Sequence, residues 1–494
     1  MCAMDHKSVK MKQLNILAYM IATLVGLLFY AVSWFVEFDY IYVLCLCCCV
    51  CYCVSLFCFV QVKGVASISC LFWLCLFVFG CSRLFLYVFG SFDFMSAPYG
   101  ILGNFYWSKD TAIAVICYYF AFMGVFSTVV LKAEKKTAQS TLHCVAENDI
   151  CDTLKAHPFG SLHQAMYLIY YICVPLVIIF YLTQVLLVMR YGYVSLYNGT
   201  INKVLPFLSI FSIVRLAFTV AYYAILSFER REKQFLVAAG VYLVINAMLL
   251  AQGSRAGLIT SAFTFLVLYC SRFKRKFKFS WLVIVLVVGI PLLEIVSYVR
   301  SGQVLTLERL LGSYSNFLSE LSGSFNIPAY YLQNKEALSI NSYPYIMEPI
   351  VKLVQYYQHV DVYSGGQSQA MIDVRFNLGH QISYHVSPGY YLQGNNFASN
   401  LIAEMAEFGI FGVVFFSYIF ARTIRFIENG IQNHSPYICY MSTEFCGWIF
   451  MAPRASAFYD TYNLFKWGLI YIVLMIGGSF FVKKIQRRKI TDAQ

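Results

Sequence analysis

The sequence predicts an all-α protein, a polytopic transmembrane helical bundle of about twelve spans. Of its 494 residues, 60% are hydrophobic and only 12% are charged, whereas roughly a quarter of the residues in a soluble domain carry charge. The charged residues also gather between long apolar stretches instead of spreading evenly along the chain. These two observations exclude a water-soluble globular protein.

Each apolar stretch has about the length that a helix needs to cross a bilayer, near 20 residues. The first stretch follows Lys7, Lys10 and Lys12 and superficially resembles a signal peptide. It lacks a small-residue cleavage site and leads straight into further spans, so we interpret it as an uncleaved first helix. The predicted spans lie near residues 14–34, 39–60, 66–90, 111–131, 164–189, 204–226, 234–251, 256–271, 280–298, 398–421, 438–453 and 463–482.

The basic connectors fix the predicted topology. With the N-terminal lysines in the cytoplasm, twelve alternating spans put every basic connector on the cytoplasmic side, which is the bias that membrane insertion imposes. The net charge of +12 therefore reflects insertion, and no nucleic-acid partner is expected. The chain divides into nine spans over residues 1–298, a large periplasmic loop over 299–397, three spans over 398–482 and a basic cytoplasmic tail over 483–494.

The cysteines are expected to be small buried hydrophobes rather than disulfides or metal ligands. No CxxC pair is accompanied by a histidine, so neither a metal nor a cofactor is expected. Seven of the 18 cysteines fall in a single apolar span: Cys45, Cys47, Cys48, Cys49, Cys51, Cys53 and Cys58.

The large loop has helical periodicity, which a disordered segment lacks. Apolar residues recur at helical spacing from Leu307 to Leu321 and again from Ile346 to Tyr357. We expect two amphipathic helices that lie at the membrane surface and roof a cavity. Helices that merely cap the bundle are an equally good interpretation.

Arginines on the predicted outer face run against the insertion bias and are candidates for binding an anion. Arg255 lies in a Gly-Ser-Arg-Ala-Gly turn, where nearby backbone N–H groups and a guanidinium fork suit a phosphate or diphosphate. Snorkelling to the interface is the ordinary alternative for this residue. Arg300, Arg375 and Arg454 are further outer-face cations, and pairing with loop carboxylates such as Asp373 is as good an explanation for the loop arginines.

Possible bases also lie on the outer side. His380 and His385 are available bases or ring-stacking groups, although either one alone is more often structural. Where the loop re-enters the membrane, polar residues recur at spacings that place them on one face of a helix. Such a stripe is costly against lipid, so it is expected to face a wet cavity or a protein partner. Its members are Asn396, Asn400, Glu404 and Glu407.

These segments together resemble the O-antigen polymerases of the Wzy type, which are relatives of the O-antigen ligases. The resemblance rests on the turn at Arg255, the large outer loop late in the chain, Glu320 in a Ser-Glu-Leu-Ser-Gly stretch, and the Asn-Leu-Ile-Ala-Glu to Phe-Gly-Ile-Phe-Gly run that ends at Gly412. It covers roughly residues 160 to 480. One departure is Asn395-Asn396, where ligase-like relatives commonly have a histidine followed by asparagine, so a histidine role does not carry over to that position.

The resemblance implies an inverting, metal-independent glycosyl transfer at the outer face of the bacterial inner membrane, with undecaprenyl-diphosphate-linked repeat units as substrates and membrane lipids and a chain-length regulator as further partners. Arg255, Arg300, Arg375 and Arg454 are then expected to contact the diphosphate, and Glu320, Glu404 and His380 to act in proton acceptance or sugar binding. A lipid-linked oligosaccharide flippase, which Arg83 and Arg215 inside apolar runs would suit, an O-antigen ligase and a non-catalytic scaffold are the alternatives.

Overall fold

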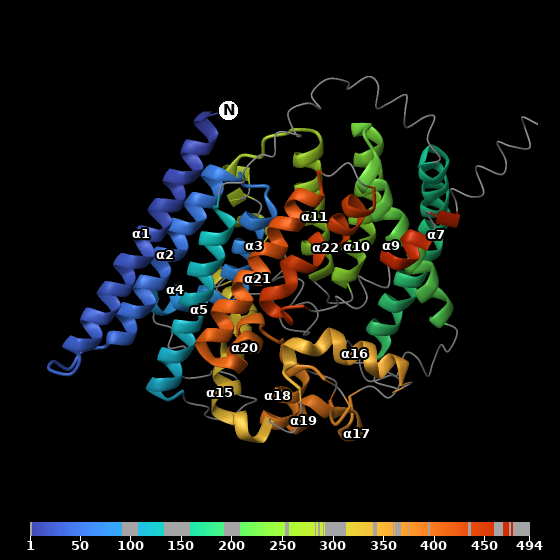
Figure 1. Cartoon of the computed structure of the whole chain (residues 1–494). Helices are drawn as coiled ribbons and strands as arrows, with labels where there is room; N and C mark the ends of the chain where they lie inside the picture. Colours follow the sequence, from blue (N-terminus) through green and yellow to red (C-terminus); the bar gives the residue numbers. More distant parts are fainter. Residues whose placement is uncertain are drawn as a thin grey trace, which may run out of the picture.

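The computed structural model of the chain describes residues 2–90, 107–132, 159–191, 208–251, 256–281, 313–338, 343–358, 367–374, 376–393, 396–432, 436–458 and 468–473, with short pieces at 283–284, 287–289, 291, 360 and 476–477. Every regular element in this part of the chain is helical. The predicted all-α class is therefore confirmed. Figure 1 shows a bundle of long helices with a layer of short helices across the end away from the N-terminus.

The long helices match the predicted spans. Seven stretches of the described chain are long and apolar enough to cross a membrane, and α9 and α11 carry shorter apolar segments. The predicted spans near 280–298 and 463–482 lie largely outside the described residues, so the total of about twelve stays a prediction. The bundle helices are α1 (Cys2–Val32), α2 (Tyr40–Val62), α3 (Ile68–Leu76) continued by the π-helix η1 (Phe77–Cys81) and α4 (Ser82–Phe89), α5 (Lys109–Val130), α7 (Phe159–Tyr191), α9 (Leu208–Phe228), α10 (Glu232–Ala251), α11 (Ala256–Arg272), α21 (Gly409–Gly430) and α22 (Pro436–Met451).

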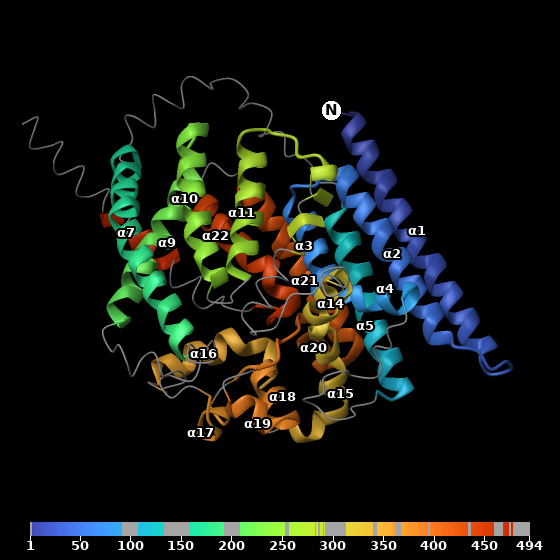
Figure 2. The same ribbon diagram turned by 180° about the vertical axis from the view of Figure 1, so that it is seen from behind.

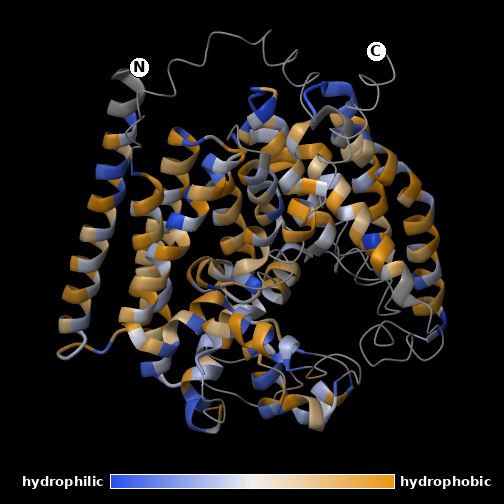
Figure 3. Cartoon of the chain, turned by 45° about the vertical axis from the view of Figure 1, so that its right-hand side comes forward, coloured by the Kyte–Doolittle hydropathy of each residue, from blue (hydrophilic) through white to orange (hydrophobic). Residues whose placement is uncertain are grey.

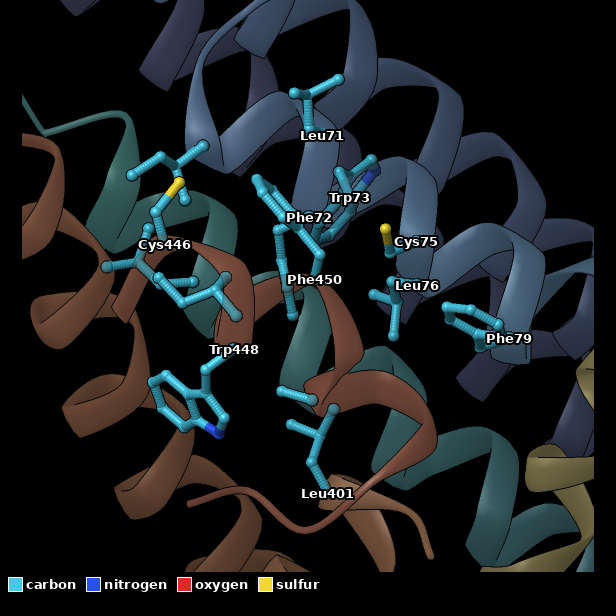
Figure 4. Packing of buried hydrophobic residues seen from close by; sticks show 14 of the residues in the cluster. Leu71, Phe72, Trp73, Cys75, Leu76, Phe79, Leu401, Cys446, Trp448 and Phe450 are labelled. Carbon is cyan, nitrogen blue, oxygen red and sulfur yellow. The ribbon is translucent and has the colours of Figure 1, made fainter. Parts of the chain in front are cut away.

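The core of the bundle is aromatic. Phe72 of α3 packs against Phe126 of α5 and Phe420 of α21, with ring centroids 4.9 and 5.3 Å away. Figure 4 shows buried side chains of α3, among them Phe72, together with Phe450 of α22. Figure 3 shows hydrophobic residues along the bundle helices and hydrophilic ones at the turns. Among the described cysteines, those of α2 are free thiols and most are buried in this core, as the apolar interpretation requires.

The large loop folds into more helices than the two that its periodicity predicts. They are α14 (Ser313–Leu321), the 3-10 helix η5 (Ser322–Asn326), α15 (Ile327–Leu338), η6 (Tyr345–Met347), α16 (Glu348–Tyr357), α17 (Gln369–Ile372), α18 (Leu378–Val386) and α19 (Pro388–Leu392). The first predicted amphipathic helix, from Leu307 to Leu321, is described only from Ser313 as α14, and there Phe317 and Leu321 are buried in the main core of the bundle, as in the capping interpretation. The second corresponds to α16 and keeps an exposed apolar face.

The predicted polar stripe on one helix is also wrong, because the chain from 396 to 412 is not one helix. Residues 396–400 are irregular, and the short helix α20 (Leu401–Met405) begins only after Asn400, which caps its N-terminus. The 3-10 helix η7 (Ala406–Phe408) then ends at Gly409, whose φ of +65° favours glycine. At Gly412 a Cβ atom would lie 2.5 Å from the carbonyl oxygen of Met405, so the joint between η7 and α21 needs glycine there too.

Candidate functional site

The structure describes only part of the predicted site. Arg255, Arg300 and Arg375 lie outside the described residues. Glu320 lies in α14, and its side chain is likewise outside what is described. Glu404, His380 and Arg454 are described and belong to one region of the molecule.

In this region the large loop enters the bundle. It consists of η1, η5, residues 396–400 with α20, and the 3-10 helix η8 (Ala452–Arg454), and we call it the junction. The π-helix η1 is in contact with both η5 and η8, and α20 is in contact with η8. Four segments that are remote in sequence therefore meet at one place. π-helical turns inside α-helices are frequent at functional sites.

Arg83 holds the loop in the junction. Its side chain is 1% exposed. The guanidinium donates from Nη1 to Asn326 Oδ1 at 3.0 Å and from Nε to Ser322 Oγ at 3.2 Å. It also donates from Nη2 to the carbonyl oxygen of Ser319 at 3.1 Å. Because Ser319 and Ser322 flank Glu320, Arg83 fixes the backbone of the segment that carries this predicted catalytic residue.

Sequence reasoning placed Arg83 among the features of a transporter and left it out of the site. The signal was an arginine inside an apolar span, which is expensive unless the guanidinium has buried partners. The partners lie about 240 positions later in the chain, so spacing alone gave no means of finding them.

The backbone of η1 receives contacts from two of the other segments. Ser324 Oγ of η5 donates to the carbonyl oxygen of Phe79. The guanidinium of Arg454 lies over the ring of Phe79, 5.8 Å from its centroid. This distance is within the range of a cation–π interaction. The predicted diphosphate-binding Arg454 is therefore held on the same turn that receives the loop.

Asn400 links the junction to α5. Its amide nitrogen donates to Tyr119 Oη at 2.9 Å and to the carbonyl oxygen of Ser324 at 3.0 Å. Its Oδ1 accepts from the backbone N–H groups of Ile402 and Ala403, and so caps α20. Asn400 is thus part of the scaffold of the site.

Glu404 is fully buried, and both of its carboxylate oxygens have hydrogen-bond donors. Oε1 accepts from Ser399 Oγ at 3.1 Å. Oε2 accepts from Ser456 Oγ at 2.9 Å and from the backbone N–H of Ala457 at 2.8 Å. The carboxylate therefore ties the start of α20 to the turn that directly follows Arg454.

His380 lies on α18 and reaches the loop segment that precedes Asn400. Its Nε2 lies 3.3 Å from the amide nitrogen of Asn396, and its ring meets that of Tyr391 edge to face at 5.7 Å. Ser383, one turn later on α18, accepts from the backbone N–H of Phe397 at 2.5 Å. The structure therefore brings His380 beside Asn396, which belongs to the stretch where the sequence departs from its ligase-like relatives. Among the described residues, His385 makes no comparable contact with this stretch.

The opposite end of the bundle, which carries the N-terminus (Figure 1), holds a different polar cluster. Glu229, between α9 and α10, is buried and accepts from Tyr167 Oη at 2.5 Å, with His163 Nε2 at 3.2 Å. Arg231 Nε also donates to it at 3.2 Å, and Arg272 of α11 donates to its backbone carbonyl. We call these five residues the latch, since they join the ends of four helices.

Ionisation of Glu229 is favoured by its partners. Burial opposes the charged form, but the hydrogen bonds from His163, Tyr167 and Arg231 outweigh it, so the pKa of this carboxyl lies below its usual range. At neutral pH the negatively charged Glu229 therefore faces the positively charged Arg231. Its basic members come from connectors that the sequence analysis placed in the cytoplasm.

A family model described as O-antigen polysaccharide polymerase Wzy matches residues 16–485. No curated protein and no solved structure matches the chain. Since the match covers nearly the whole sequence, the chain belongs to the O-antigen polysaccharide polymerase Wzy family.

Proposed function

We propose that this polymerase moves a growing glycan from its undecaprenyl diphosphate carrier to an incoming lipid-linked repeat unit, at the periplasmic face of the bacterial inner membrane. The observation that carries the proposal is the junction. There the large loop is fastened into the bundle by Arg83, beside Arg454 and the buried carboxylate of Glu404. A chain-length regulator is a further partner of the proposed enzyme.

The proposed reaction is a single displacement with inversion. A hydroxyl oxygen at the non-reducing end of the incoming unit attacks the anomeric carbon of the growing chain, and the bond from that carbon to the diphosphate oxygen breaks. The hydroxyl proton passes to a base, and undecaprenyl diphosphate leaves with the bonding electrons. Negative charge grows on the leaving diphosphate, and fixed cations stabilise such charge in a preorganised site.

In this proposal Arg255, Arg300, Arg375 and Arg454 contact the diphosphate. Arg454 is the one whose surroundings are described, and its guanidinium over Phe79 is held at the junction. An arginine held in this way has little freedom left to lose when an anion binds. No metal is needed for the charge stabilisation that these four arginines supply.

Two side chains are proposed as proton acceptors, Glu320 and His380. Glu320 lies on the segment that Arg83 fixes, and His380 lies beside Asn396 at the edge of the junction. Glu404 is assigned a positioning role instead of the proton acceptance that its sequence motif suggested. Both of its oxygens are occupied, and the turn that it holds carries Arg454.

The experiment that tests this function is reconstitution of the purified protein with synthetic undecaprenyl-diphosphate-linked repeat units. We expect a ladder of products that differ by one unit, with no added metal or nucleotide sugar. A single transfer that requires the lipid A core as acceptor would show a ligase. Movement of intact units across the bilayer with no new glycosidic bond would show a flippase. Either of these outcomes would overturn the proposal.

The alternative function, a flippase, was suggested by Arg83 and Arg215, and the contacts of Arg83 no longer favour it. Arg83 suited a transporter because a cation inside a span suggests a pathway near the bilayer midplane. Its guanidinium instead holds the Ser319 to Asn326 segment of the large loop. The polymerase is the function that this contact favours.

A further inference from the structure

The helix α16 has its two faces arranged in the opposite way to a helix on the surface of a water-soluble domain. Its polar residues Glu348, Lys352 and Gln355 face the protein, and Glu348 is only 1% exposed. Its apolar residues point outward, with exposed fractions of 41% to 73%: Ile350, Leu353, Val354 and Tyr357. These four recur at i, i+3, i+4 and i+7, the spacing of one helical face. An apolar face of this kind is unfavourable against water.

The direction of α16 indicates what covers this face. Figures 1 and 2 show α16 lying across the end of the bundle, roughly at right angles to the long helices α10 and α11. A helix perpendicular to the spans, at the level where they end, lies in the plane of the membrane–water interface. Two tyrosines, Tyr356 and Tyr357, occupy its last turn, and tyrosine is enriched at this level of a bilayer.

The polar face of α16 grips the segment that contains Arg375. Asn377 Nδ2 donates to both carboxylate oxygens of Glu348, at 3.0 and 3.1 Å. Gln355 Nε2 donates to the carbonyl oxygen of Val374 at 2.7 Å. Lys352 Nζ lies 2.6 Å from Glu348 Oε1, which balances the carboxylate. Val374, directly before Arg375, and Asn377, two residues after it, are therefore both fastened to α16.

We propose that α16 is an interfacial helix whose apolar face lies in the outer leaflet of the membrane, and that it holds the Arg375 segment at a fixed height above the bilayer. The occupant of the apolar face is lipid, at the boundary between head groups and acyl chains. The two charged side chains of α16 are paired with each other, so the contact is apolar and does not select anionic lipids.

This inference deepens the proposed function and rests on it in one respect, the diphosphate as the ligand of Arg375. A polyprenyl diphosphate places its charged group where the acyl chains end. A helix that rests on the same boundary sets the distance between the arginine segment and that group. Side chains that reach a reacting centre need positioning to within about 1 Å.

The test of lipid docking uses the full-length protein in nanodiscs with radiolabelled phospholipid. A photo-crosslinking amino acid replaces Leu353 or Val354 on the exposed face, and Val351, which packs inward against the loop core, is the matched control. We expect lipid adducts at 353 and 354 several-fold above those at 351, and the same yield in low and high salt and in bilayers without anionic lipid. Adducts to a second copy of the chain, or equal lipid labelling at all three positions, would overturn the proposal.

A second variant separates the helix from the reaction. Leu353→Lys with Val354→Lys weakens the apolar contact and leaves Glu348 and Gln355 in place. We expect several-fold slower transfer from full-length undecaprenyl donors in a bilayer, and unchanged transfer from a short, water-soluble prenyl donor in detergent. Equal losses with both donors would contradict the proposal that α16 positions the Arg375 segment through its contact with the membrane. If the wild type forms no ladder while lipid adducts at 353 persist, the proposed function fails and the docking of α16 stands.

Discussion

The latch and the junction hold their segments together with different contacts. In the latch, a carboxylate meets cationic or ionisable groups, with Glu229 against Arg231 and His163. At the same end, Glu428 meets Lys63 at 3.3 Å and Glu232 meets Arg275 at 2.9 Å. In the junction, the described hydrogen bonds of Arg83 and Glu404 go to hydroxyl, amide and backbone groups.

In the proposed function, the latch joins helix ends and the junction holds the reacting groups. Paired charges neutralise one another, and they hold helix ends together without attracting a further ion. In the junction, the guanidinium of Arg83 fixes the loop segment that supplies its hydroxyl, amide and carbonyl partners. The substrate of the proposed reaction is an anion, and the junction is the end at which the large loop and its arginines enter.

The largest effect is expected at Arg83. Arg83→Met removes a buried guanidinium and its hydrogen bonds to Asn326 Oδ1, Ser322 Oγ and the Ser319 carbonyl oxygen, at about 1–3 kcal/mol for each buried group left unmatched. We expect no polymer and a strong fall in the unfolding temperature of the purified protein. Arg83→Lys keeps the charge but not the three-way fork, so an intermediate loss is expected. Full-length polymer from the Met variant at normal membrane levels would refute the role of Arg83 in the junction.

The next effect concerns the joint between η7 and α21. At Gly412 an added Cβ would lie 2.4 Å from Phe408 Cβ, so Gly412→Ala forces the joint apart at about 1–3 kcal/mol. Gly240→Ala in α10 is the matched control, because nothing lies within 4 Å of its added Cβ and alanine favours a helix interior. Thermal unfolding in detergent is expected to fall for the first variant and to hold or rise slightly for the second. The same shift in both variants would contradict the claim that the joint between η7 and α21 requires glycine at position 412.

A smaller effect is expected at Glu404. Glu404→Leu removes the acceptor of Ser456 Oγ and of the backbone N–H of Ala457, and this N–H cannot turn away as a hydroxyl can. The cost is about 1–3 kcal/mol, the usual penalty of an unmatched buried group. Ladder formation per folded molecule is expected to fall only in part, with an unchanged pH profile, because the residue positions Arg454. Complete loss of transfer with unaltered unfolding would instead assign Glu404 the proton.

The smallest effect is expected in the latch. Glu229→Gln lowers stability by about 1 kcal/mol and leaves the rate per folded molecule unchanged. Since the pKa of Glu229 is lowered in the folded protein, its carboxylate stabilises the fold above the ordinary pKa of a glutamate, and this stabilisation is lost as the pH falls toward the lowered value. The difference in unfolding temperature between wild type and variant is therefore expected to hold from pH 7 down to about pH 5 and to shrink between about pH 5 and pH 3. A constant difference over that range would show that the charge of Glu229 is irrelevant.

Local signals in the sequence were sufficient for the helices. Apolar stretches of span length gave α2, α5, α10 and α11 within a few residues, because a lipid-facing helix carries its own signature. The span predicted at 398–421 was misplaced, since α21 covers Gly409–Gly430. The broken helix at 401–412 was missed although Gly409 and Gly412 stand in the sequence, since the polar spacing was taken as continuous. The glycines were the better signal.

The candidate site was less accessible to sequence reasoning, because its contacts join distant segments. Arg454 and Glu404 were selected separately, and only the fold shows that the turn after Arg454 is tied to Glu404. The burial of α14 against the bundle was left open for the same reason. An amphipathic pattern tells that one face is covered, and it does not tell whether lipid or the bundle covers it.

The most direct measurement of the difference between the ends is the initial rate of ladder formation by matched arginine variants in nanodiscs. Arg454→Gln removes a cation from the junction, and Arg231→Gln removes one from the latch. The account predicts a rate at least about 100-fold lower for Arg454→Gln, the scale of one lost charge-stabilising contact, and a rate unchanged for Arg231→Gln at equal folded protein. Equal rates for the two variants, or a loss confined to Arg231→Gln, would contradict it.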